Sequence, residues 1–163
     1  MKLILCMLFM LISAKECDEN KTEVSENTLS GVEANAQQQM LSENETITYQ
    51  ATTRGFFLKI WIEGDLIMVS NDYSLKTVET YAFPSEEKEA FLNLIDTVDA
   101  TSLPEVDVKS TSFQTDVAPM AFLQISEGKN IYKSKPFDHG NPPEAISAMV
   151  EKILSIKTLI ENQ

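Results

Sequence analysis

The sequence predicts an α+β domain, in which two helices pack on one face of an antiparallel sheet. Three observations predict this class. Apolar and polar residues alternate over four short segments in the first half of the domain, which is typical of a β-meander. Two later segments place apolar residues at helical spacing. A further pair of alternating segments surrounds Glu127-Gly128-Lys129, which is typical of a β-hairpin. The expected order is therefore a four-strand meander, a helix, a hairpin and a C-terminal helix.

The meander is expected to contain four strands, which span residues 47–52, 56–62, 66–70 and 75–83. Alternation in the second strand places Phe57, Lys59 and Trp61 together on one face. Phe57 and Trp61 are aromatic residues of the kind found at binding surfaces, so we take them as candidate binding residues. The alternative is that both side chains pack under a helix.

The two helices carry different start signals. Ser85 can cap a first helix over residues 86–98. Before the second helix, Asn141 is a good N-cap, Pro142 suits the first helical position, and Glu144 stands where a capping box requires it. The residues between the helices are expected to form a polar loop and then the hairpin, at 105–117, 120–125 and 131–137.

The first residues have the pattern of an export signal. Lys2 precedes the uncharged run Leu3–Ser13, whose 11 residues are too few to span a membrane. A run of this length fits the central part of a signal peptide, so residues 1–16 are predicted to direct export. We expect a periplasmic or outer-membrane lipoprotein, or alternatively a secreted protein.

Two cleavage sites are open. A cut after Ala14 leaves Lys15 as the new N-terminus, whereas a cut before Cys17 leaves a cysteine that resembles the acylated cysteine of bacterial lipoproteins. Either cut removes Cys6, so Cys17 remains unpaired in an exported protein. Lipidation explains that cysteine and predicts a membrane partner through a lipid anchor.

Residues 17–45 are predicted to form a disordered acidic stalk. The segment from Lys15 to Glu45 contains eight acidic residues, two lysines and no aromatic residue. Such a composition cannot bury enough apolar surface to offset the entropy of ordering. The folded domain is expected to span residues 46–163, with a net charge of −7.

Composition excludes several functions. A net charge of −12 argues against a nucleic-acid partner, because binding phosphates requires clustered basic residues. A single histidine argues against a His-rich metal site, and the five glycines form no phosphate-binding loop. We therefore expect no metal and no cofactor.

Two singular residues are candidates for function. His139, the only histidine, follows Asp138, and a catalytic interpretation would make it a general base. Adjacent residues in a strand point to opposite faces, however, so the alternative is a turn in which both side chains make local hydrogen bonds. Arg54, the only arginine, suits recognition of a carboxylate, or alternatively pairs with a nearby acid in an ordinary turn.

Three motifs resemble an uncharacterised family of small exported bacterial proteins: Arg54-Gly55-Phe56, Leu103-Pro104, and Asp138-His139-Gly140-Asn141-Pro142-Pro143-Glu144. The resemblance covers about residues 46–158 and implies a signal, a stalk and the same order of elements, but no activity. The chain is also similar, more weakly, to emfourin-type inhibitors of thermolysin-like metalloproteases. That likeness implies an inhibitory turn at 53–57, although Arg54 stands where those inhibitors have a second glycine.

These observations predict a non-enzymatic binding domain of the bacterial cell envelope, whose partner is an envelope protein or a protease. The candidate binding residues are Arg54, Phe57, Trp61, Asp138 and His139. The competing hypothesis is a proteinaceous inhibitor of a metalloprotease.

Overall fold

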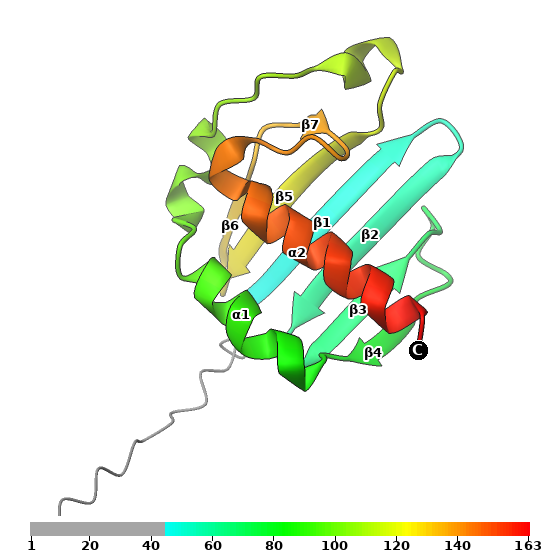
Figure 1. Ribbon diagram of the computed structural model, residues 1–163. Helices are drawn as coiled ribbons and strands as arrows, with labels where there is room; N and C mark the ends of the chain where they lie inside the picture. Colours follow the sequence, from blue (N-terminus) through cyan, green and yellow to red (C-terminus); the bar gives the residue numbers. More distant parts are fainter. Residues whose placement is uncertain (1–44) are drawn as a thin grey trace, which may run out of the picture. The chain divides into compact units, whose positions relative to one another are not determined.

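The computed structural model describes residues 45–163 (Figure 1). The predicted signal peptide at 1–16, Cys17 and the stalk up to residue 44 lie outside the described residues. Glu45, which the sequence assigned to the stalk, is the first residue of a strand. The described residues all belong to one compact unit, and its core is a single cluster of buried hydrophobic side chains.

The fold is α+β, as predicted, with one antiparallel sheet of seven strands. The strands are β1 Glu45–Thr53, β2 Phe56–Glu63, β3 Leu66–Ser70, β4 Glu79–Ala82, β5 Met120–Glu127, β6 Asn130–Lys133 and β7 Phe137–Asp138. Their order across the sheet is β4-β3-β2-β1-β5-β6, and β7 also pairs with β5. The meander therefore joins the hairpin through the antiparallel pair β1 and β5.

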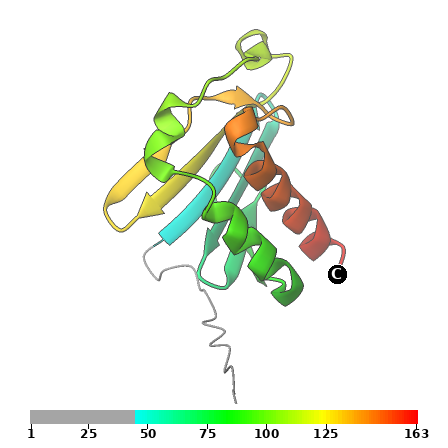
Figure 2. The same cartoon turned by 60° about the vertical axis from the view of Figure 1, so that its left-hand side comes forward.

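Two α-helices, α1 Ser85–Ile95 and α2 Glu144–Glu161, cover one face of the sheet (Figures 1 and 2). Two short 3₁₀ helices follow α1: η1 Ala100–Glu105, which ends where the polar loop at 105–117 was predicted to begin, and η2 Ser112–Thr115, which lies within that segment. The placement of both α-helices on one face confirms the expected layer arrangement.

The core lies between the helices and the facing side chains of the long strands. Every second residue of these strands is buried, as the period of a strand requires. The strand residues that form this core include Ile47, Tyr49, Ala51, Leu58, Ile60, Ile62, Ala121, Leu123 and Ile125. Helix α2 buries six apolar residues against them: Ile146, Met149, Val150, Ile153, Ile156 and Ile160.

The fourth strand is much shorter than the predicted 75–83. Asp72 accepts hydrogen bonds from the backbone N–H groups of Ser74 and Lys76, at 2.9 and 3.0 Å, and so closes a local turn. Leu75 within this turn has a positive φ of 54°. The alternating apolar residues of this segment consequently lie in a loop, and β4 begins only at Glu79.

Both predicted helix caps are wrong. Helix α1 begins at Ser85 itself, after Pro84, and ends at Ile95 rather than at residue 98. Helix α2 begins at Glu144 after a buried Pro143, and neither helix has a side-chain cap hydrogen bond. Asn141 instead donates its backbone N–H to the Asp138 carbonyl at 2.9 Å, in a turn before the helix.

The predicted second strand of the hairpin is interrupted. Ser134 donates its N–H to the Leu123 carbonyl at 2.8 Å and accepts the Leu123 N–H with its hydroxyl at 3.1 Å. This double contact ends the regular pairing, and Pro136 follows, which cannot donate a backbone hydrogen bond. The chain then pairs again with β5 as the separate strand β7.

Candidate functional site

The sheet face opposite α1 and α2 has no α-helix of the described residues packed on it. We call this surface the open face and define it by a cluster of five residues: Phe57, Lys59, Trp61, Phe122 and Lys133. The first three alternate with the core residues of β2, Phe122 does so in β5, and Lys133 lies opposite Gln124 in the hairpin. Phe57, Lys59, Trp61 and Phe122 are half-buried and Lys133 is exposed.

Polar side chains connect the members of the open face. Gln50 of β1 lies directly between Lys59 and Phe122, whereas Thr48 lies between Trp61 and Gln124. Thr48 is 7% exposed, because its larger neighbours on both sides cover it. The face is therefore continuous from β2 across β1 to β5.

Both lysines of the open face lie over aromatic rings. Lys59 Nζ is 4.9 Å from the centre of the Trp61 ring, and Lys133 Nζ is 3.4 Å from that of Phe122. Such cation–π contacts hold an ammonium group in place without neutralising its charge. Tyr73 extends the surface on the other side, with its ring edge against Phe57 at 5.4 Å between ring centres.

The lysines on the helical side are arranged differently, because they form ion pairs. Lys88 contacts Asp65 at 2.5 Å, Lys157 contacts Glu161 at 2.6 Å, and Lys152 pairs with Glu87. Lys109 reaches Glu144 at 3.6 Å. Each of these pairs includes a residue of α1 or α2. Within residues 45–163, neither lysine of the open face has a carboxylate partner.

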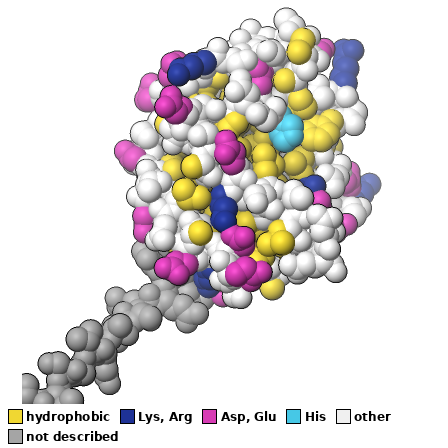
Figure 3. Space-filling model, viewed as in Figure 1, with side chains coloured by type: hydrophobic (Ala, Val, Ile, Leu, Met, Phe, Trp, Pro, Cys, Tyr) yellow, Lys and Arg dark blue, Asp and Glu magenta, His cyan; other side chains and the backbone are white. Residues whose placement is uncertain are grey.

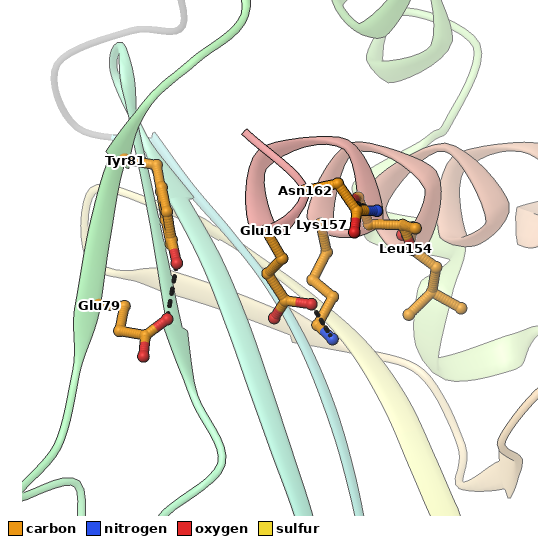
Figure 4. Close-up of polar contacts among 7 residues, drawn as sticks. Glu79, Tyr81, Leu154, Lys157, Glu161 and Asn162 are labelled. Atoms are coloured by element: carbon orange, nitrogen blue, oxygen red, sulfur yellow. Dashed lines mark hydrogen bonds and ion pairs between the residues drawn. The ribbon is translucent and has the colours of Figure 1, made fainter.

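Figure 4 shows this pairing at the C-terminal end of α2. Lys157 and Glu161 join one turn apart on the helix, and the Tyr81 hydroxyl donates to the Glu79 carboxylate at 2.6 Å on neighbouring β4. The hydrogen bond to Glu79, together with the negative charges of Glu79 and Glu161, raises the pKa of Tyr81. These charged groups therefore contact one another at this end of the helix.

The turn between β1 and β2 carries the single arginine. Arg54 is exposed, and Gly55 has a φ of 78°, a conformation that glycine adopts without strain. Phe56 follows, 37% exposed, with its ring centre 5.5 Å from that of His139. Figure 3 shows His139 surrounded by hydrophobic side chains on the helical side of the molecule.

His139 binds a buried tyrosine rather than Asp138. Tyr49 is fully buried, and its hydroxyl lies 2.6 Å from His139 Nδ1. The two atoms share one hydrogen bond, in which the ring tautomer of His139 decides which atom donates. Burial lowers the pKa of His139 and raises that of Tyr49. At neutral pH the pair is a neutral structural hydrogen bond.

Asp138 forms hydrogen bonds with a different segment, residues 110–113. Its carboxylate accepts backbone N–H groups from Ser112 at 3.0 Å and Phe113 at 2.7 Å, as well as the Ser110 hydroxyl. Burial raises the pKa of Asp138, but these three donors outweigh it and hold the pKa below its usual value. The carboxylate therefore fixes the chain around η2.

The five sequence-predicted binding residues do not form one site. Phe57 and Trp61 lie on the open face, Arg54 is at the β1–β2 turn, and Asp138 and His139 make separate contacts. As expected, the side chains of Asp138 and His139 do not contact each other and point to different neighbours. Their hydrogen bonds, however, reach distant segments of the chain rather than local ones.

Phe122 and Lys133 were missed. The alternation in residues 120–125 places Phe122 on the non-core side, so this signal was present in the sequence. The sequence does not show, however, that β5 pairs with β1, and this pairing brings Phe122 near Trp61.

Residues 45–163 contain no group of three or more His, Cys, Asp or Glu side chains that could hold a metal ion. None of the helices in this part of the chain has both the length and the apolar character of a membrane span. Comparison with protein-family models, with curated proteins and with solved structures finds no match.

We predict that His139 stabilises the fold through Tyr49. In wild-type protein, His139→Leu should lower the free energy of unfolding by about 1–3 kcal/mol, because the buried Tyr49 hydroxyl loses its hydrogen-bond partner. In a Tyr49→Phe background the same substitution should cost clearly less. Urea unfolding of the four proteins, followed by Trp61 fluorescence, measures the coupling. Equal costs in both backgrounds would contradict the interaction.

The lowered pKa of His139 also predicts that the free energy of unfolding depends on pH. The lowered pKa of His139 means that, below the ordinary value of 6.5, the unfolded chain binds more protons than the folded one. The free energy of unfolding should therefore fall as the pH drops from about 7.5 to about 5.5, and His139→Leu should flatten this slope. A slope identical in both proteins would show that His139 does not titrate differently on folding.

Proposed function

We propose that this chain is a non-enzymatic binding domain, exported and tethered to the membrane through Cys17, whose partner docks on the open face. One observation carries the proposal: the sheet presents aromatic rings and lysines without a carboxylate partner on a face that no described α-helix covers. Aromatic residues are enriched in interface centres and dominate binding energy there.

The two faces of the sheet differ in composition, and this difference supports a structural role for one face and a binding role for the other. The helical side forms the core, with its lysines in ion pairs, and stabilises the domain. The open face contributes nothing to that core, yet holds three large aromatic side chains half-buried. A surface of this composition gains free energy when a partner removes it from water.

The roles of Asp138 and His139 favour binding over catalysis. Each side chain is used in a partly buried hydrogen bond that stabilises a separate part of the fold. A general base must be oriented by a neighbouring group, and here Asp138 is directed to the η2 segment instead. This arrangement supports a structural role for both residues.

We predict that Trp61→Ala reduces capture of the partner from a cell-envelope extract. Immobilised protein of residues 37–163 provides the bait, and quantitative mass spectrometry identifies proteins retained by wild type. Glu151→Ala, an exposed change on α2, is the matched control and should retain them. Lys133→Ala is a second variant that leaves the aromatic packing of β2 intact. Equal capture by all variants would contradict docking on the open face.

Inhibition of a metalloprotease is the second candidate function, supported by the β1–β2 turn. Arg54 is exposed there, and the contact between Phe56 and His139 braces the turn against the domain. A braced turn loses little entropy when it enters a protease cleft.

If the turn inhibits, residues 37–163 should slow peptide hydrolysis by a thermolysin-like protease at micromolar concentration. Arg54→Ala should then weaken inhibition, whereas Trp61→Ala, on the open face, should leave it unchanged. Absence of inhibition by folded wild-type protein would remove this candidate.

Acylation of Cys17, the proposed membrane anchor, can be tested separately. Metabolic labelling with a palmitate analogue should mark the full-length chain and not Cys17→Ala, because the acylated group is the cysteine. The variant should also leave the membrane fraction. Full-length protein that stays unlabelled and is released to the medium would contradict the anchor and favour cleavage after Ala14.

A further inference from the structure

We propose that the open face binds an acidic polypeptide in extended conformation, with carboxylates of the polypeptide contacting Lys59 and Lys133. This inference rests on the proposed function and adds the chemistry of the partner.

The first argument is the distribution of charge. Residues 46–163 hold 17 acidic and ten basic residues, and four of the lysines pair with a carboxylate beside α1 or α2. The strand register places two carboxylates of the described strands on the open-face side: Glu63, at the end of β2, and Asp138, whose oxygens accept hydrogen bonds from residues 110–113. Lys59 and Lys133 pair with neither, so their ammonium groups are complementary to the carboxylates of an acidic partner.

The second argument is the position of the ammonium groups. Because Lys59 lies over Trp61 and Lys133 over Phe122, these rings are covered by positive charge on the side where the lysines lie. Stacking of a sugar or a nucleobase on that side would first have to displace the lysine and lose the cation–π contact. A carboxylate keeps that contact and adds an ion pair, so acidic side chains fit the face better than stacking ligands.

The third argument is spacing. Trp61 and Phe122 lie on β2 and β5, with β1 between them, and Thr48 and Gln50 place them two residues apart along the strands. From the usual strand spacing and rise, the Cα atoms of Trp61 and Phe122 are about 12 Å apart across the face, and each ring carries one lysine ammonium group. In an extended peptide, residues four apart point to the same side at about 13 Å. Acidic residues at every fourth position would therefore meet both lysines.

The face also lowers the entropic cost of such an interaction. Lysine side chains normally lose considerable rotamer freedom on binding, but a contact with a ring restricts them beforehand. Gln50 and Gln124, between the two rings and beside Lys133, offer amide groups to the backbone of a bound strand.

Synthetic peptides test the inference directly. One peptide carries glutamate at every fourth position among threonine and valine, and a second has the same composition with its glutamates adjacent. A third replaces glutamate by glutamine. Binding to residues 37–163 is measured by anisotropy of labelled peptide, while Trp61, the only tryptophan of the chain, reports contact with the open face.

The spaced peptide should bind most tightly, and added salt should weaken it. Lys59→Gln and Lys133→Gln should each raise its Kd about threefold to fivefold, and the double variant about tenfold or more. Lys76→Gln, an exposed change in the β3–β4 loop, is the matched control and should leave the Kd unchanged.

Several results would overturn the inference: no binding of the spaced peptide, equal binding of the peptide with adjacent glutamates, or no effect of the lysine substitutions. Tighter binding of an oligoglucuronate would assign the face to an acidic polysaccharide instead. If the peptides fail while Trp61→Ala still abolishes partner capture, the open face is a binding surface and only the chemistry of its partner is wrong. If both fail, the proposed function falls with the inference.

Discussion

The burial of one face of β1, β2 and β5 beneath α2 is the constraint on which the rest of this structure depends. The side chains of a strand alternate between two faces, so committing Ile47, Ile60 and Leu123 to the core commits their neighbours to the other side. A slip of one residue would bury Lys59 and expose Ile60. The open face is thus a direct product of the packing that stabilises the domain.

The distribution of buried polar groups follows from the same packing. Tyr49 alternates with Thr48 and so enters the core, where its hydroxyl requires a partner and finds His139 from a chain segment 90 residues away. Asp138, the preceding residue, lies on the other side of its short strand and serves the η2 segment. Two adjacent residues therefore connect distant parts of the chain, and this connection makes the end of the sheet near the β1–β2 turn well defined.

Local patterns predicted the strands, the helices and their order, because alternation and helical spacing are set by the residues of each element itself. The errors occurred where distant contacts or loop chemistry decide. The turn at Asp72 shortened β4, and the double contact of Ser134 with Leu123 divided the hairpin. For the candidate sites, alternation correctly grouped Phe57 with Trp61, whereas the neighbourhood of Phe122 and Lys133 depends on strand pairing across the sheet. The partner of His139 could not be predicted for the same reason.

The lengths of the strands bear on how this protein associates with others. Its long strands β1, β2 and β5 lie inside the sheet, and the outermost positions are taken by β4 and β6, of four residues each, and by β7, of two. A short edge offers few free backbone groups, so a second chain gains little by adding itself as a further strand. Such an edge protects the sheet from indiscriminate pairing with unfolded or extended chains. Selective association with another chain therefore depends on side-chain contacts rather than on backbone hydrogen bonds at the sheet edge.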